Sequence, residues 1–150
     1  MAQPIVDLEI MFPCHGKVDA NACWKEVPSK DDPCCADIDN PRIITKGNAL
    51  KVDVNWNAVG SLFSWLANGN WYWNVEVRLE AIGSAANANV QKSAPPVLNT
   101  GPGAYAATVI FPYGDLTPGE VYRMVVLLHL EDGTNMAVCG FRELGTIHVQ

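Results

Sequence analysis

An all-β sandwich is the fold class that this sequence predicts, and three observations support it. Long stretches alternate between apolar and polar residues, which is the period of a β-strand. Turn residues separate these stretches at regular intervals, and no stretch has a convincing helical period. Hydrophobic residues make up 49% of the 150 residues, enough for one packed core. We therefore expect a single domain over residues 1–150.

The stretch 116–130 predicts a tight turn that leads into a long central strand. Pro118 and Gly119 suit the two middle positions of a turn. Beyond the turn, Tyr122 begins a row of alternating apolar residues, and the opposite face is half apolar, as in a strand in the middle of a sheet. We expect Tyr122 to bury its ring and to bond its hydroxyl to upstream backbone.

Further strands are expected at 5–12, 42–45, 50–56, 71–81, 105–111 and 135–149, with a short edge strand near Val90. Pro95 and Pro96 exclude a central strand next to Val90. Gly140 and Gly145 are expected bulge or bend points. The alternation predicts a core of Val52, Val54, Trp56, Trp73, Val75, Val77, Tyr122, Met124, Val126 and Leu128.

Residues 13–41 show no periodicity and predict a cysteine-containing insertion ahead of a sandwich core at 45–149. This segment holds four of the five cysteines, namely Cys14, Cys23, Cys34 and Cys35. Two disulfides, each joining Cys14 or Cys23 to Cys34 or Cys35, would hold such a polar segment in order. The fifth, Cys139, is expected to be a buried thiol or a partner for one of the four.

Metal binding is the alternative use of this insertion. Zinc could be held by the four cysteines with His15, but no two of them have the C-x₂₋₄-C spacing of a zinc site. Calcium could be held by the acidic residues at 31–32 and 37–40, which lack the glycine and distal glutamate of an EF-hand loop. Free thiols are the third reading of the cysteines, and no cofactor is expected.

Three motifs together resemble a fibronectin type III domain, a family of immunoglobulin-like sandwiches. The stretch 50–56 is similar to that family's second strand with its core Trp56, and 73–77 is similar to its third strand. The turn and strand at 116–126 are similar to its tyrosine corner, with Tyr122 as the corner residue. The resemblance covers residues 45–149 and implies an antiparallel immunoglobulin-like sandwich. It also implies a protein-binding role, because members of this class mostly bind proteins.

The connection at 58–70 is the candidate binding site. It carries Leu62, Phe63, Trp65 and Leu66, more apolar surface than a turn requires, and could hold a short helical turn. With the sheet edge at 88–98, it predicts a non-catalytic protein-interaction or structural module, or a self-assembling subunit. A carbohydrate-binding module that uses Trp65 and Tyr72 is the alternative. In the competing structural reading, Phe63 and Leu66 plug the open end of the sandwich.

Several other functions are not expected. The net charge of −6 disfavours nucleic acid as a partner. No apolar run approaches the ~20 residues of a membrane helix, so no membrane insertion is expected. None of the three histidines stands in a catalytic motif, and the sequence predicts no enzyme. The N-terminus lacks the pattern of a secretory signal, which leaves the compartment open, although oxidised cysteines would favour an extracellular one.

Overall fold

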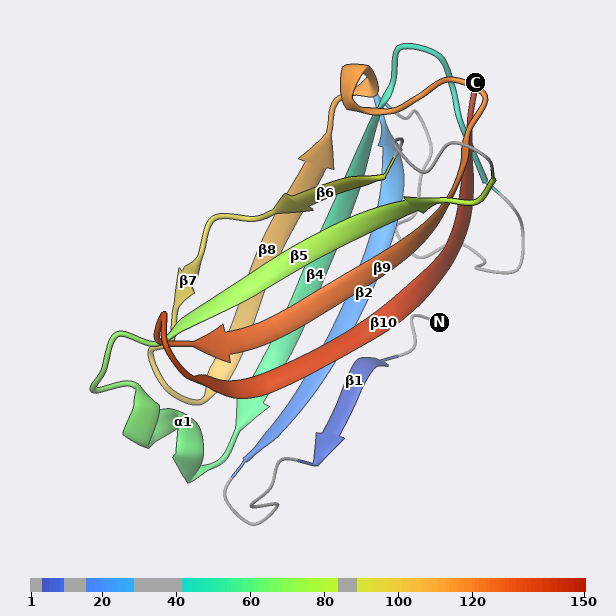
Figure 1. The fold of residues 1–150 in the computed structure, drawn as a ribbon. Coiled ribbons are helices and arrows are strands. Elements are labelled where there is room, and N and C mark those ends of the chain that lie inside the picture. Colours follow the sequence, from blue (N-terminus) through green and yellow to red (C-terminus); the bar gives the residue numbers. More distant parts are fainter. Residues whose placement is uncertain (1–3, 10–15, 29–41, 84–88) are drawn as a thin grey trace.

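The computed structural model describes residues 4–9, 16–28, 42–83 and 89–150, which form two β-sheets and one short α-helix (Figure 1). The elements are β1 (Pro4–Glu9), β2 (Lys17–Val27), β3 (Arg42–Ile44), β4 (Ala49–Val59), α1 (Ser61–Leu66), β5 (Tyr72–Ala81), β6 (Val90–Ser93), β7 (Val97–Leu98), β8 (Gly103–Phe111), the 3-10 turn η2 (Tyr113–Asp115), β9 (Val121–Glu131) and β10 (Met136–Val149).

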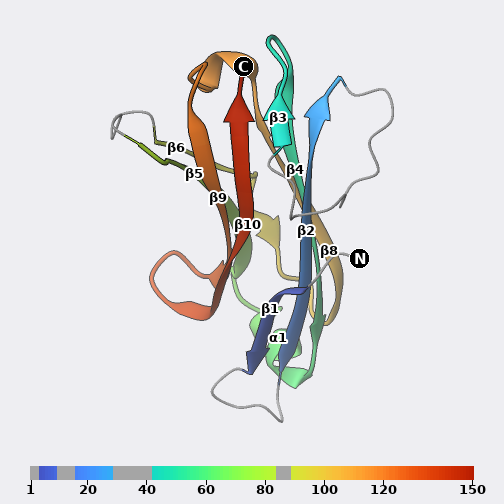
Figure 2. The same cartoon turned by 90° about the vertical axis from the view of Figure 1, so that its right-hand side faces the viewer.

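The two sheets face each other as the layers of a sandwich (Figure 2). The first sheet has the order β1-β2-β4-β8, and the second has the order β3-β10-β9-β5-β6, with β7 also paired to β5. Neighbouring strands are antiparallel except for β3, which runs parallel to β10. The predicted all-β sandwich is confirmed, and so is the central position of β9.

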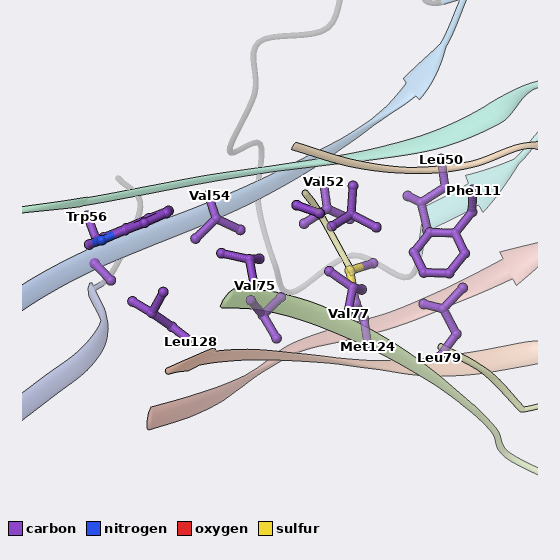
Figure 3. Close-up of a cluster of buried hydrophobic side chains, with 14 of the residues drawn as sticks. Leu50, Val52, Val54, Trp56, Val75, Val77, Leu79, Phe111, Met124 and Leu128 are labelled. Atoms are coloured by element: carbon purple, nitrogen blue, oxygen red, sulfur yellow. The ribbon is translucent and has the colours of Figure 1, made fainter. Parts of the chain in front are cut away.

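The core lies between the layers and is built from β4, β5 and β9 (Figure 3). All ten residues of the predicted core are 2% exposed or less. They are buried because one face of each strand carries large apolar side chains at every second position. Phe111 of β8 and Leu79 of β5 extend the same core, which Figure 3 shows between the two layers.

Tyr122 occupies the corner that the sequence predicts. Its ring is fully buried, and its hydroxyl accepts a hydrogen bond of 3.0 Å from the backbone N–H of Thr117. The turn between them is closed by the Glu120 N–H, which donates to the Thr117 carbonyl at 3.2 Å. Gly119 has a φ of 85°, which a residue with a side chain rarely adopts. The turn and the buried ring together fix where β9 begins.

The expectation of an irregular segment at 13–41 is wrong for residues 17–27. These residues form β2, which lies between β1 and β4 and pairs with β4 along its whole length. Val18 and Ala20 are fully buried there, so β2 is part of the sandwich. Within this segment, residues 13–15 and 29–41 lie outside the described part of the chain. The strand expected at 5–12 is confirmed over residues 5–9 by β1 (Pro4–Glu9), and residues 10–12 lie outside the described part.

Two register shifts in β10 decide which of its side chains face outward. They fall between Met136 and Val138 and between Glu143 and Gly145, so Gly145 marks a bulge but Gly140 does not. After the first shift, Val138 turns inward and Cys139 outward. Cys139 is therefore an exposed thiol opposite His129, and the expectation that it is buried is wrong.

The remaining elements are short. The edge strand predicted near Val90 is β6, which pairs with β5 and ends before Pro95. The helical turn predicted within 58–70 is α1, six residues long. Among the described residues, no helix is long and apolar enough to cross a membrane.

Candidate functional site

A cluster of aromatic rings closes the end of the sandwich where β4 ends and β5 begins. The ring of Trp73 lies 5.7 Å from Trp56, 5.6 Å from Phe63 and 5.6 Å from Tyr105, measured between centroids. Trp56 and Tyr105 are stacked at 5.7 Å with an angle of 11° between their planes. These contacts join β4, β5, β8 and α1, and the helix rests on Trp73, whose ring in turn contacts rings of the first sheet.

Asn99 is the polar centre of this cluster, and its side chain is 1% exposed. Its Oδ1 accepts hydrogen bonds from Trp73 Nε1 at 3.3 Å and from the Tyr105 hydroxyl at 3.2 Å. Its Nδ2 donates to the Phe63 carbonyl oxygen at 3.0 Å. A buried amide with all of these partners holds them in a defined arrangement. The last bond ties the backbone of α1 directly to the core.

The side chains of α1 divide between the core and the solvent. Phe63 is fully buried, and Leu62 and Leu66 pack against the core while partly exposed. Trp65 is 62% exposed. The helix is closed by the Ala67 N–H, which donates to the Phe63 carbonyl at 3.0 Å. Figure 1 shows α1 at the end of the sandwich between β4 and β5. The helix thus carries a solvent-exposed indole on an anchored backbone.

The predicted binding residues are therefore only partly brought together. Phe63 plugs the end of the sandwich, as the competing structural reading expects, and is corrected from a contact residue to an anchor. Trp65 keeps the exposure that a contact residue needs. Asn99 was not predicted, because its partners lie 26 and 36 residues away and a lone asparagine beside a glycine turn carries no sequence signal.

Tyr72 lies on the outer face of the second sheet and is 37% exposed. It lines a shallow hollow of about 300 Å³ with Asn74, Pro96, Glu131, Asp132 and Gly133. Within the hollow, Asn74 Nδ2 donates to Glu131 Oε1 at 3.0 Å. One aromatic face beside carboxylate and amide groups is an arrangement that can hold a sugar ring.

The outer face of the second sheet also carries ion pairs. Arg78 Nε lies 2.5 Å from Glu76 Oε1, and Arg123 pairs with Glu80 across β5 and β9. The hydrogen bond and the charge of Glu80 raise the pKa of Arg123. Both carboxylates that project from one face of β5 are thus paired with arginines. Such exposed pairs contribute little to stability.

Of the five cysteines, the structure describes only Cys23 and Cys139. Cys23 lies half-buried on β2, opposite Asp53 of β4. Cys14, His15, Cys34, Cys35 and the acidic residues at 31–32 and 37–40 lie outside the described residues, so disulfide pairing, zinc and calcium stay predictions. Within the described ranges, no three His, Cys, Asp or Glu side chains are grouped so that they could hold a metal ion.

No protein-family model matches the chain, and no curated protein matches it.

Proposed function

We propose that this chain is a non-catalytic protein-interaction module and that Trp65 on α1 is its principal contact residue. One observation carries the proposal, namely that Trp65 is 62% exposed on a helix whose Phe63 is fully buried. Leu62, Trp65 and Leu66 are neighbours on the surface of α1 and are all at least partly exposed, and a contiguous apolar surface of this kind marks an interaction site. Tryptophan is also among the residues that contribute most to protein interfaces.

The anchoring of α1 supports this role. The buried Phe63 ring and the bond from Asn99 Nδ2 to the Phe63 carbonyl hold the helix before any partner arrives. A rigid contact surface loses little conformational entropy on binding. Trp65 can then contribute to affinity without first ordering the segment that carries it.

We further propose that the sandwich is immunoglobulin-like, with the character of a fibronectin type III domain. In support, β2-β4-β8 face β10-β9-β5, which is the order A-B-E opposite G-F-C in immunoglobulin-like domains. The corner bond of Tyr122 also fits this class. In this proposal the cysteine-rich insertion is reduced to the segment between β2 and β3.

A carbohydrate-binding module is the second candidate, and the hollow beside Tyr72 favours it. The proposal for Trp65 and the proposal for Tyr72 use different surfaces. Tyr72→Ala would weaken binding of an oligosaccharide in calorimetry and leave protein contacts unchanged. Trp65→Ala would weaken protein contacts and leave oligosaccharide binding unchanged.

The proposed function is tested by sedimentation equilibrium, with a second copy of the chain as the first partner examined. The variants are Trp65→Ala and Phe141→Ala. Phe141 is a matched control because it is 72% exposed and lies on β10, in the second sheet. We expect Trp65→Ala to weaken association and Phe141→Ala to leave it unchanged. Equal effects of the two variants would contradict the role of Trp65.

A further inference from the structure

The edge of the first sheet at β8 lacks the features that usually protect an edge strand from pairing. Such strands are normally short, or carry charges, proline or a bulge. β8 is nine residues long, contains no charged residue and no proline, and pairs with β4 without a register shift. In the described part of the chain, its neighbour in the sheet is β4 on one side, with no strand on the other.

The other edge strands of the described structure are protected. β1 has a register shift between Pro4 and Val6 and carries Asp7 and Glu9. β3 has three residues, and β6 and β7 have four and two, separated by Pro95 and Pro96. β6 approaches β8 near Phe111, where Lys92 Nζ lies 5.8 Å from the ring centroid, but it does not pair with β8. The contrast marks β8 as the edge whose backbone groups are available to a further strand in the described part of the chain.

Core-facing side chains in the first part of β8 are less buried than their partners on β4. Tyr105 and Ala107 face the core but are only half-buried, whereas their partners Trp56 and Val54 on β4 are fully buried. On the outer face, Ile110 is 49% exposed. A strand added to this edge would cover side chains on both faces of the sheet.

We infer that β8 pairs antiparallel with β8 of a second copy of this chain, around a two-fold axis at Ala107. This dimer contact rests on the proposed function only for the premise that the chain binds protein. It goes beyond that function because it names the partner and a second surface. In this register each large residue meets a small one or a β-branched one. The pairs are Gly103 with Phe111, Ala104 with Ile110, Tyr105 with Val109, and Ala106 with Thr108.

The lack of charged residues on β8 is compatible with this register. Two copies that each carry a net charge of −6 repel each other on average. Paired through β8, they place no charged side chains opposite each other, because the strand has none. The geometry is isologous, so the same strand supplies both halves of the contact.

Sedimentation velocity of the full chain over a wide range of concentration tests this contact. The variant is Ala106→Lys, which places a lysine opposite Thr108 of the other copy and makes the two lysines diagonal neighbours of like charge across the axis. Its matched control is Asn55→Lys, because Asn55 is exposed and lies opposite Ala106 on β4, one strand in from the edge. We expect the wild type and Asn55→Lys to dimerise with rising concentration and Ala106→Lys to dimerise about tenfold more weakly or not at all.

A second pair of variants, Ala104→Lys and Asn57→Lys, lies two residues further along the same two strands. It distinguishes a loss of the dimer contact from a local folding defect at residue 106. A wild type that stays monomeric, or equal dimerisation of Ala106→Lys and Asn55→Lys, would overturn the inference. If Trp65→Ala abolishes association while Ala106→Lys does not, the result contradicts the contact through β8 and supports the proposed function of Trp65. If only Ala106→Lys weakens association, the result supports the contact through β8 and contradicts the role of Trp65.

Discussion

Trp73 and Asn99 are joined by a hydrogen bond of 3.3 Å from the indole Nε1 to the amide Oδ1, in the centre of the aromatic cluster. The same asparagine bonds the Phe63 carbonyl, so the core of the second sheet and the backbone of α1 share one buried polar group. Asn99 thus holds α1 through a buried hydrogen bond, as Tyr122 holds the turn before β9.

Asn99→Ala should destabilise the fold by about 3 kcal/mol, because it leaves the Trp73 indole N–H and the Phe63 carbonyl buried without this partner. Asn57→Ala is the matched control, since Asn57 is exposed on β4. Urea denaturation followed by circular dichroism measures both. A loss no larger than that of the control would mean that the network does not support the end of the sandwich.

Tyr122→Phe should destabilise the fold by roughly 1 kcal/mol, because the Thr117 N–H loses the hydroxyl that accepts its hydrogen bond. Tyr122→Ala should cost roughly 3–5 kcal/mol, because it also empties a fully buried site. Urea melts of the two variants separate the hydrogen bond from the packing. Small and equal effects would show that Tyr122 does not hold the corner.

The strands with large alternating side chains could be predicted from the sequence, whereas β2 could not. Val52, Val54 and Trp56 on β4 make the period of two obvious, and all of them are buried. In β2 the inward positions after Val18 are Ala20 and Ala22, whose small side chains give a weak hydrophobic signal. Its position between β1 and β4 depends on pairing with distant residues, which local periodicity does not contain.

The short helix within 58–70 could be predicted from the sequence, but the burial of each of its side chains could not. The apolar residues of 58–70 indicated an unusual connection, yet Phe63 and Trp65 are chemically alike and only the docking of α1 decides which is buried. The outward direction of Cys139 depends on the register shift between Met136 and Val138, which no glycine or proline marks. Both outcomes are set by tertiary packing.

Asp132 gives a prediction for pH. Its carboxylate accepts hydrogen bonds from the backbone N–H groups of Asn135 at 2.6 Å and Thr134 at 2.8 Å. These bonds lower the pKa of Asp132. A carboxyl whose pKa is lowered by folding stabilises the turn above its unfolded pKa, and this contribution is lost as the pH falls through the folded pKa.

The backbone amide shifts of Thr134 and Asn135, followed by NMR, should therefore titrate below the usual range of an aspartate. Asp132→Asn is the control, because its amide oxygen can still accept these bonds but does not titrate in this range. Amide shifts that titrate at or above the usual aspartate range would contradict the turn geometry.

The cysteines give a prediction for alkylation. If Cys14, Cys23, Cys34 and Cys35 form two disulfides, native protein without reductant should take up one alkyl group, at the exposed Cys139. Reduction under denaturing conditions should raise the number to the five cysteines of the chain. Mass spectrometry reads both values. Five alkyl groups on the native, unreduced protein would remove the disulfide reading, and stoichiometric zinc would replace it.

Paired variants at Phe63 and Trp65 test whether α1 is divided between an anchor and a contact residue. Phe63→Ala should lower the free energy of unfolding by about 3–5 kcal/mol, because its ring is fully buried. Trp65→Ala should leave the melting temperature nearly unchanged, because its indole is mostly exposed.

The deciding measurement is the association constant of Trp65→Ala, taken with its melting temperature on the same preparation. We expect association to be weakened by about thirtyfold, equivalent to ~2 kcal/mol, with a melting temperature close to that of the wild type. A strongly lowered melting temperature with unchanged association would contradict this expectation, since Trp65 would then be part of the packing that closes the sandwich.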